Sequence, residues 1–158
     1  MSIFNTGKSL IKGTKVVPIF LTVSNDYVPY ASCVIRSIIQ HTHPNRYYRI
    51  ILVCNSLSFR NYIKLRRLVT RNCEIQFHKL SRNPYLHAIA KFCSNRISGG
   101  DFYFSPVYFY RFFLPRFFLN YDKAIYLDSD TIVLDDIGKL FDIDLGDKVI
   151  AATADTKV

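Results

Sequence analysis

The sequence lacks several features that would place it in a narrow structural class. Its four cysteines form no C-x-x-C pair, and its six Gly and six Pro are scattered along 158 residues. It contains no low-complexity tract, heptad series or internal repeat. Coiled coils and repeat arrays are therefore excluded. The cysteines fit buried free thiols of a reducing cytosol better than disulfides or zinc ligands.

Long apolar runs are also missing. No stretch reaches the roughly 20 residues that a membrane-spanning helix needs. Three lysines precede the apolar run Val16–Val23, which imitates a signal peptide, but polar Ser24-Asn25-Asp26 follows without a small-x-small cleavage site. We therefore expect a polar leader over residues 1–14 and a first β-strand after it.

Acidic residues are scarce, with 12 Asp and Glu against 21 Lys and Arg, so the net charge is +9. Such a charge favours anionic partners: nucleic acid, an anionic membrane face or phosphorylated substrates. The one dense basic patch is typical of a solvated helix face and contains Lys64, Arg66, Arg67 and Arg71. No recognised nucleic-acid-binding pattern accompanies the basic residues, so we expect no nucleic-acid partner.

The residues that are present predict one α/β domain over residues 15–158. Apolar runs of strand length are typical of strands buried on both faces of a sheet, and they occur at 16–23, 49–54, 74–78, 123–127 and 148–152, with strand-like character at 131–134. Helical patterns alternate with them, at 26–40, from Ser58, at 84–92, 105–113 and 136–141. This alternation predicts a Rossmann-like, mostly parallel sheet covered by helices.

Two local features of the helices are open to test. Asp26 is expected to cap the first helix, and Pro115 is expected to stop or kink the helix that Ser105 and Pro106 begin.

Residues 102–121 contain eleven Phe or Tyr. They fit core packing against the sheet better than an interfacial membrane helix, which Arg111 and Arg116 would also allow.

Polar clusters follow the first and fourth predicted strands, where ligands bind in parallel sheets. They are Ser24-Asn25-Asp26 and Asp128-Ser129-Asp130. In extended chain, residues i and i+2 point to the same side, so Asp128 and Asp130 can both offer oxygens to one hard cation such as Mg²⁺ or Mn²⁺. An acidic turn without a ligand is the plain alternative. A haloacid dehalogenase-like phosphatase is a second one, but Ile132 stands where its D-x-D-x-T/V pattern needs Thr or Val, and about 120 residues precede the motif.

The segment SPVYFYRFFLPRFFLNYDKAIYLDSDTIVLDDIGKLFDIDLGDKVIAATAD resembles the central block of glycosyltransferase family 8, which includes bacterial lipopolysaccharide galactosyl- and glucosyltransferases and the glycogenin relatives. A Tyr-x-Arg helix, a strand, Y-L-D-x-D and a short acidic helix occur in the same order. FLTVSNDYVPYASCVIRSI resembles the family's first strand, donor-binding loop and first helix. The similarity extends from about Pro18 to Val158.

The resemblance implies roles for individual residues. Asp128 and Asp130 would hold Mn²⁺ or Mg²⁺ at the diphosphate of a UDP-sugar, with Ser129 between them at the donor. Arg111 would contact the donor near the sugar and diphosphate. The uracil and ribose would lie on the loop that contains Thr22, Val23, Asp26 and Tyr27. Asp155 aligns near the acceptor, and no catalytic nucleophile can be named.

Two departures from the family pattern affect the expected function. Ser24 stands where many members have Asp, and none of the four histidines follows Asp130, although the family's third metal ligand is a His near the C-terminus. We therefore expect a domain of the nucleotide-diphospho-sugar transferase type that is truncated at its C-terminus. Either it belongs to a retaining hexosyltransferase, or it is an inactive remnant or nucleotide-binding module.

The resemblance also implies partners and a place of action. The donor would be UDP-glucose or UDP-galactose, and the acceptor a lipopolysaccharide or another glycan. The reaction would occur in the cytoplasm, where nucleotide sugars are found. The positive charge is compatible with a peripheral position on the inner face of the membrane.

Overall fold

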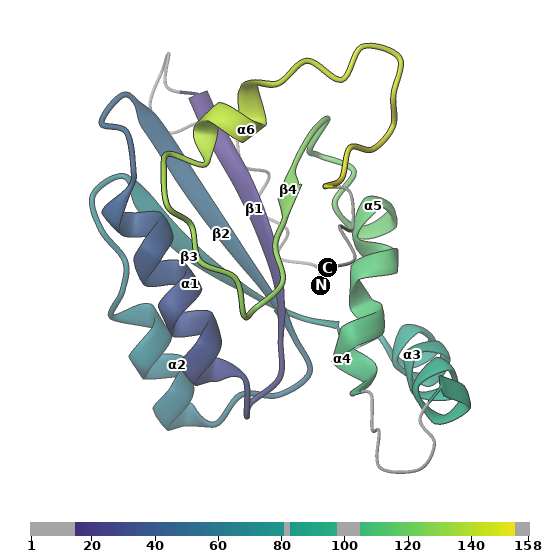
Figure 1. The fold of residues 1–158 in the computed structure, drawn as a ribbon. Coiled ribbons are helices and arrows are strands. Elements are labelled where there is room, and N and C mark those ends of the chain that lie inside the picture. The colour runs from purple at the N-terminus through teal and green to yellow at the C-terminus, as the bar shows by residue number, and fades with distance from the viewer. Residues whose placement is uncertain (1–14, 81–82, 98–104, 154–158) are drawn as a thin grey trace, which may run out of the picture.

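A single parallel sheet organises the computed structural model, which describes residues 15–80, 83–97 and 105–153. Its strands lie in the order β3-β2-β1-β4 (Figure 1). Their bounds are β1 Lys15–Val23, β2 Arg46–Cys54, β3 Cys73–Lys79 and β4 Ile125–Tyr126. The predicted α/β class and the parallel sheet are confirmed.

The two central strands are buried on both faces, as their unbroken apolar runs predict. β1 and β2 pair in parallel from Lys15↔Arg46 to Val23↔Cys54. One face of the sheet packs on the helices α1 Val28–Gln40 and α2 Phe59–Arg66. The other face, which includes Phe20, packs on α3 Pro84–Ile97 and on the helical stretch formed by α4 Pro106–Phe109, η2 Tyr110–Phe113 and α5 Leu114–Phe117. The aromatic segment thus contributes six of its rings to this second core: Phe109, Tyr110, Phe113, Phe117, Phe118 and Tyr121.

The first helix begins one residue later than predicted. Its N-cap is Tyr27, which makes no side-chain cap hydrogen bond, and Asp26 is exposed, so the prediction that Asp26 caps the helix is wrong. Pro29 in the first turn has no N–H, which removes one of the donors that a cap would satisfy. The predicted buried face is correct, since Ala31, Val34, Ile35 and Ile38 are all buried.

The second helix begins where predicted, because the Oγ of its N-cap Ser58 accepts a hydrogen bond from the Asn61 N–H at 3.3 Å. The predicted stop or kink at Pro115 agrees with the element boundaries, because η2 ends at Phe113 and a separate short helix, α5, begins at Leu114. Pro115 lies in the first turn of α5, where a missing N–H needs no partner, so the helical stretch continues to Phe117. A short α3 was expected, but this helix extends to Ile97.

The segment that follows Lys123 contains less strand than predicted. Of residues 123–127 only Ile125 and Tyr126 pair with β1, and residues 131–134 and 148–152 form no strand. The side chains of Val149 and Ile150 are 97% and 80% exposed. An apolar run predicts burial, but a strand also needs a partner for its ladder, and no described strand pairs with either segment.

The cysteine prediction is confirmed in part. All four cysteines are free, and Cys54 and Cys73 are buried, whereas Cys33 is exposed. Burial raises the pKa of the Cys54 thiol to about 11 and that of Cys73 to about 12, so both stay protonated.

The basic residues of the patch around α2 are all exposed, as a solvated face requires. Within the described residues, no helix is both long and apolar enough to span a membrane.

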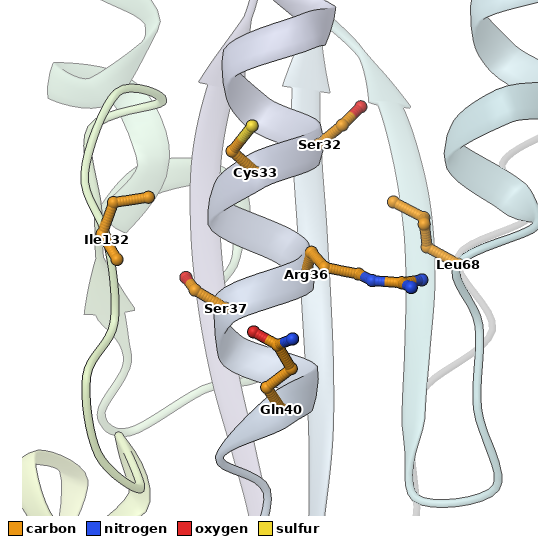
Figure 2. Close-up of a pocket in the computed structure, with 7 residues that line it drawn as sticks. All are labelled: Ser32, Cys33, Arg36, Ser37, Gln40, Leu68 and Ile132. Atoms are coloured by element: carbon orange, nitrogen blue, oxygen red, sulfur yellow. The ribbon is translucent and has the colours of Figure 1, made fainter.

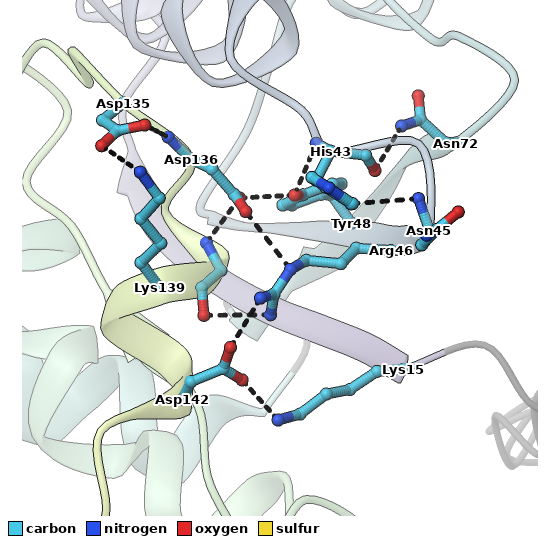
Figure 3. Close-up of polar contacts among 11 residues, drawn as sticks. Lys15, His43, Asn45, Arg46, Tyr48, Asn72, Asp135, Asp136, Lys139 and Asp142 are labelled. Carbon is cyan, nitrogen blue, oxygen red and sulfur yellow. Dashed lines mark hydrogen bonds and ion pairs between the residues drawn. The ribbon is translucent and has the colours of Figure 1, made fainter.

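An ionic clamp fastens α6 (Gly138–Asp142) to the amino ends of β1 and β2 (Figure 3). Arg46 is its centre: it lies 3.2 Å from Asp136 and 2.5 Å from Asp142, and donates to the Gly138 carbonyl at 3.1 Å. Lys15 also pairs with Asp142. These two cations hold the pKa of Asp142 well below its usual range. The clamp lies at the edge of the sheet opposite to the predicted ligand site.

Candidate functional site

The acidic turn Asp128-Ser129-Asp130 lies beside the carboxyl end of β1. The Leu127 N–H donates to the Phe20 carbonyl at 3.0 Å, and Ser129 Oγ donates to the Thr22 carbonyl at 2.7 Å. These bonds continue the contact between β4 and β1 beyond the last ladder pair. Ser129 is buried, and the Asp residues on either side of it are exposed. The buried serine thus anchors the turn while both carboxylates face solvent.

Asp128 is bound to its neighbours through one of its two oxygens. Asp128 Oδ1 lies 2.9 Å from Nη2 of Arg111 and accepts a hydrogen bond from the Tyr126 hydroxyl at 3.0 Å. The side chain of Asp128 is 50% exposed and that of Arg111 is 21% exposed. No described residue makes a hydrogen bond or ion pair to the carboxylate of Asp130. The pair therefore has one positive partner, which is on Asp128.

Tyr126 joins the acidic turn to the end of β1. Its hydroxyl lies 3.0 Å from Thr22 Oγ1 as well as 3.0 Å from Asp128 Oδ1. A carboxylate can only accept, so the single phenolic proton goes to Asp128 and the Thr22 hydroxyl donates to the tyrosine oxygen. Burial raises the pKa of Tyr126 to about 12, so the phenol keeps this proton at neutral pH.

Arg111 is held in place by contacts with two aromatic residues. Its Nε donates to the Tyr108 carbonyl at 3.0 Å, and its guanidinium carbon lies 3.9 Å from the centroid of the Tyr108 ring. The same guanidinium carbon lies 5.0 Å from the centroid of the Tyr126 ring. Cation–π contacts of this kind favour a flat, stacked guanidinium. The last turn of η2 therefore presents Arg111 to the acidic turn in a defined orientation.

The loop after β1 is fastened to the start of α2. Asn25 Oδ1 accepts hydrogen bonds from the Ser58 N–H at 2.8 Å and from Asn61 Nδ2 at 3.0 Å. Asp26 and Tyr27, which follow, are exposed. Val23 is fully buried, so only its main chain can meet a ligand. Thr22 is buried and engaged with Tyr126.

The structure unites only part of the predicted site. Four of its residues lie in one connected network, namely Thr22, Arg111, Asp128 and Ser129. Asp26, Tyr27 and Val23 belong to the neighbouring loop and strand end at the same edge of the sheet. Asp155 lies outside the described residues. Sequence reasoning missed Tyr126, and although it placed Asn25 in a polar cluster at this edge, it missed the bonds of Asn25 to the start of α2. The i, i+2 spacing of Tyr126 and Asp128 in extended chain could have revealed Tyr126.

The donor set of the acidic turn fits a hard cation. Asp128 Oδ2 and the Asp130 carboxylate are oxygen donors open to solvent, which suits Mn²⁺ or Mg²⁺. Within the described residues, no group of three or more His, Cys, Asp or Glu could hold a metal ion. A cation at this turn would complete its shell with water and with phosphate oxygens, which Mg²⁺-type sites commonly do.

A separate shallow pocket of about 450 Å³ lies over α1 (Figure 2). It is lined by Cys33, Arg36 and Gln40 from α1, among others, and by Ile132 from the segment after the acidic turn. None of the predicted site residues lines it. This hollow is therefore distinct from the acidic turn.

Residues 18–158 match the Glycosyl transferase family 8. This chain belongs to that family. Family 8 membership confirms the resemblance found in the sequence, and it decides against the phosphatase interpretation of the acidic pair. The match includes both the loop after β1 and the acidic turn.

Known members and structures agree with this assignment. The chain is 30% identical over 140 residues to Glycosyltransferase 8 domain-containing protein 2 of Bos taurus, which covers 88% of this chain and 38% of the relative. The apo structure of the bifunctional glycosyltransferase WbbM matches with a TM-score of 0.68 and 27% identity, over 87% of this chain and 22% of that one. The galactosyltransferase LgtC, solved with donor and acceptor sugar analogues, shares the fold with a TM-score of 0.61 and 22% identity, over 83% and 44% of the two chains. The family 8 chain described here thus spans 38% of the bovine relative's length, and its predicted nucleotide-diphospho-sugar transferase fold is confirmed.

Proposed function

We propose that residues 15–158 form the nucleotide-sugar-binding part of a retaining hexosyltransferase. Its donor is UDP-glucose or UDP-galactose, and its acceptor is a lipopolysaccharide or another glycan. The observation that supports this most is the exposed acidic pair at the carboxyl edge of a parallel sheet, in which Asp128 pairs with Arg111 and Asp130 follows it in the same turn. That edge is where nucleotides bind in open α/β sheets.

The residues divide the task of holding the donor. Asp128 and Asp130 hold Mn²⁺ or Mg²⁺, which, when bound, supplies positive charge to the diphosphate and stabilises the departing UDP. Arg111 binds the diphosphate or the sugar with its planar fork of donors. Asp26, Tyr27 and the main chain of Thr22 and Val23 form the surface for uracil and ribose. Ser129 contributes by fixing the turn through its bond to the Thr22 carbonyl.

We also propose that the protein acts in the cytoplasm, at the inner face of the membrane. The outward face of α3, here called the α3 face, supports this position. It consists of Tyr85, Ala88 and Phe92 with the flanking cations Lys91 and Arg96, all of them exposed. Tyr85 is 73% and Phe92 61% exposed, and α3 contains no acidic residue. Aromatic rings flanked by cations are typical of surfaces that bind anionic lipid.

Calorimetric titration with UDP tests the proposed donor site. Mn²⁺ should strengthen UDP binding by about 10-fold or more over a chelator, which corresponds to about 1.4 kcal/mol. Asp130→Asn should remove this gain because it deletes a charged ligand. Asp147→Asn, which neutralises another exposed carboxylate, should keep it. Equal UDP affinity with Mn²⁺ and with chelator would contradict the proposal.

Transfer itself needs a second assay. A protein that contains this family 8 segment together with an acceptor-binding part should move label from UDP-glucose or UDP-galactose to a lipopolysaccharide core. Asp128→Ala should abolish that transfer. UDP binding without any transfer would instead identify a nucleotide-binding module.

A further inference from the structure

The acidic turn has an asymmetric charge environment. Both recorded partners of Asp128 bind the same oxygen, Oδ1: the Arg111 guanidinium at 2.9 Å and the Tyr126 hydroxyl at 3.0 Å. Asp128 Oδ2 and Asp130 remain available to a cation. Asp128 therefore shares one oxygen with the positive charge of Arg111, and Asp130 follows two residues later in the same turn.

Arg111 cannot easily move away from Asp128 when a metal cation binds there. Its Nε is bound to the Tyr108 carbonyl, and its guanidinium is stacked on the Tyr108 ring at 3.9 Å. A divalent ion on Asp128 would thus meet a like charge well within the Debye length of about 8 Å at physiological salt. Arg111 repels the metal ion because both are positively charged. Tyr126 is neutral, so its hydrogen bond orients the same oxygen without repelling a cation.

We propose that Arg111 is a counter-ion that weakens binding of a free divalent cation to the acidic pair and makes it depend on the nucleotide. The proposal rests on the metal site described under the proposed function. A nucleoside diphosphate adds negative charge that attracts both the cation and Arg111. This attraction offsets the repulsion between Arg111 and the cation. Arg111, which repels the cation when no nucleotide is bound, then binds the phosphates. Cation and diphosphate then each raise the affinity of the other, as linkage requires.

The experiment measures Mn²⁺ binding alone and UDP binding in saturating Mn²⁺, for the same set of variants. Arg111→Gln should bind Mn²⁺ alone about 3-fold or more tightly than the wild type, because it removes a neighbouring charge. The same variant should bind UDP with Mn²⁺ about 10-fold more weakly, because a charge-assisted contact to phosphate is lost. Changes of opposite sign are the signature of a counter-ion.

Two matched variants separate charge from geometry. Arg111→Lys keeps the charge and loses the planar fork, so its affinity for Mn²⁺ alone should stay near that of the wild type. Tyr126→Phe removes the hydrogen bond to the same Asp128 oxygen, which keeps its contact with Arg111, and changes no charge, so it should not strengthen Mn²⁺ binding. Raising the salt concentration should reduce the difference in Mn²⁺ affinity between the wild type and Arg111→Gln, because salt screens the repulsion between Arg111 and the ion.

Each outcome decides the matter. If Arg111→Gln weakens Mn²⁺ binding and UDP binding together, with Arg111→Lys equally impaired, Arg111 only supports the local structure and the proposal is overturned. A gain in Tyr126→Phe equal to that in Arg111→Gln overturns it as well. If wild type binds Mn²⁺ neither alone nor with UDP, or if Asp130→Asn leaves binding unchanged, the metal site itself is wrong and both proposals fail. Wild-type Mn²⁺ binding that Arg111→Gln does not strengthen leaves the proposed function standing and rejects the counter-ion.

Discussion

Single polar side chains fix the exposed groups of this site. Ser129 is buried between two exposed carboxylates and donates to the Thr22 carbonyl, and Asn25 fastens the loop that exposes Asp26 and Tyr27. Each anchor satisfies main-chain groups that would otherwise lack partners near the sheet edge. The flanking side chains can therefore face solvent without the loop itself being free to move.

The anchoring role of Asn25 leads to a prediction at the residue scale. Asn25→Ala removes acceptors for the Ser58 N–H and the Asn61 amide, so it should cost about 1 kcal/mol of stability for each bond lost. It should also weaken UDP binding in Mn²⁺ several-fold, because a looser loop must be ordered when the ligand binds. Calorimetry and thermal unfolding measure the two effects.

Ser56→Ala, at an exposed position of the next strand-end loop, is the matched control and should change neither quantity. Unfolding at a lower temperature with unchanged UDP affinity would show that the loop after β1 does not contact the nucleotide.

Sequence reasoning named those candidate residues whose chemistry is visible locally. Asp128 and Asp130 are evident as two carboxylates after a buried run, and Arg111 through the Tyr-x-Arg pattern. The bond between Tyr126 and Thr22 and the bonds of Asn25 escaped it because these partners are distant in the chain. Tyr126 and Thr22 are separated by 104 residues, and Asn25 and Ser58 by 33. Only the fold determines which such groups meet.

At the scale of elements, burial was more predictable than pairing. The runs that became β1 and β2 were identified because strands buried on both faces must be apolar throughout. The run at 148–152 is equally apolar, yet Val149 is 97% exposed. Hydrophobicity is a property of the segment, whereas a ladder requires a second segment at the right place. Helix limits were predicted less well, since Asp26 does not cap α1 and α3 continues to Ile97 instead of ending at Phe92.

The attachment of α6 gives a prediction at this scale. Asp136 accepts hydrogen bonds from the Tyr48 hydroxyl at 2.5 Å and the Gly138 N–H at 2.8 Å, and its side chain is 10% exposed. Asp136→Asn removes the charge that faces Arg46, so it should lower the free energy of unfolding by about 1.5–3 kcal/mol. Denaturant titration monitored by circular dichroism measures the loss.

Asp147→Asn serves as the control, because its carboxylate is 85% exposed and pairs only with the adjacent Lys148. It should change stability by less than about 0.5 kcal/mol. Equal stability of the two variants would mean that the ionic clamp does not contribute to holding α6 on the sheet.

At the scale of the whole molecule, the two faces of the sheet differ in charge and exposure. The helices α1 and α2 lie on one face of the sheet and α3 lies on the other (Figure 1). The basic patch around α2 is exposed, and the α3 face presents exposed aromatic rings together with cations. Arg96 lies over the Phe92 ring at 5.3 Å, so charge and apolar surface coincide there. The net charge of +9 attracts anionic surfaces from any direction, but only the α3 face adds rings that can enter a lipid interface.

Binding to lipid vesicles should therefore depend on the α3 face and not on net charge alone. The 158-residue chain should bind vesicles of phosphatidylcholine with phosphatidylglycerol more tightly than vesicles of phosphatidylcholine alone. Each basic residue near an anionic surface contributes about 1 kcal/mol, so Lys91→Gln with Arg96→Gln should weaken sedimentation with the anionic vesicles by about 10-fold or more. Tyr85→Ser with Phe92→Ser should weaken it too, although it changes no charge. Lys64→Gln with Arg67→Gln lowers the net charge of the other face by the same amount and should have a much smaller effect. If the two charge pairs weaken binding equally and the aromatic pair has no effect, the attraction is a general one of a basic protein to an acidic surface, and the α3 face has no special role.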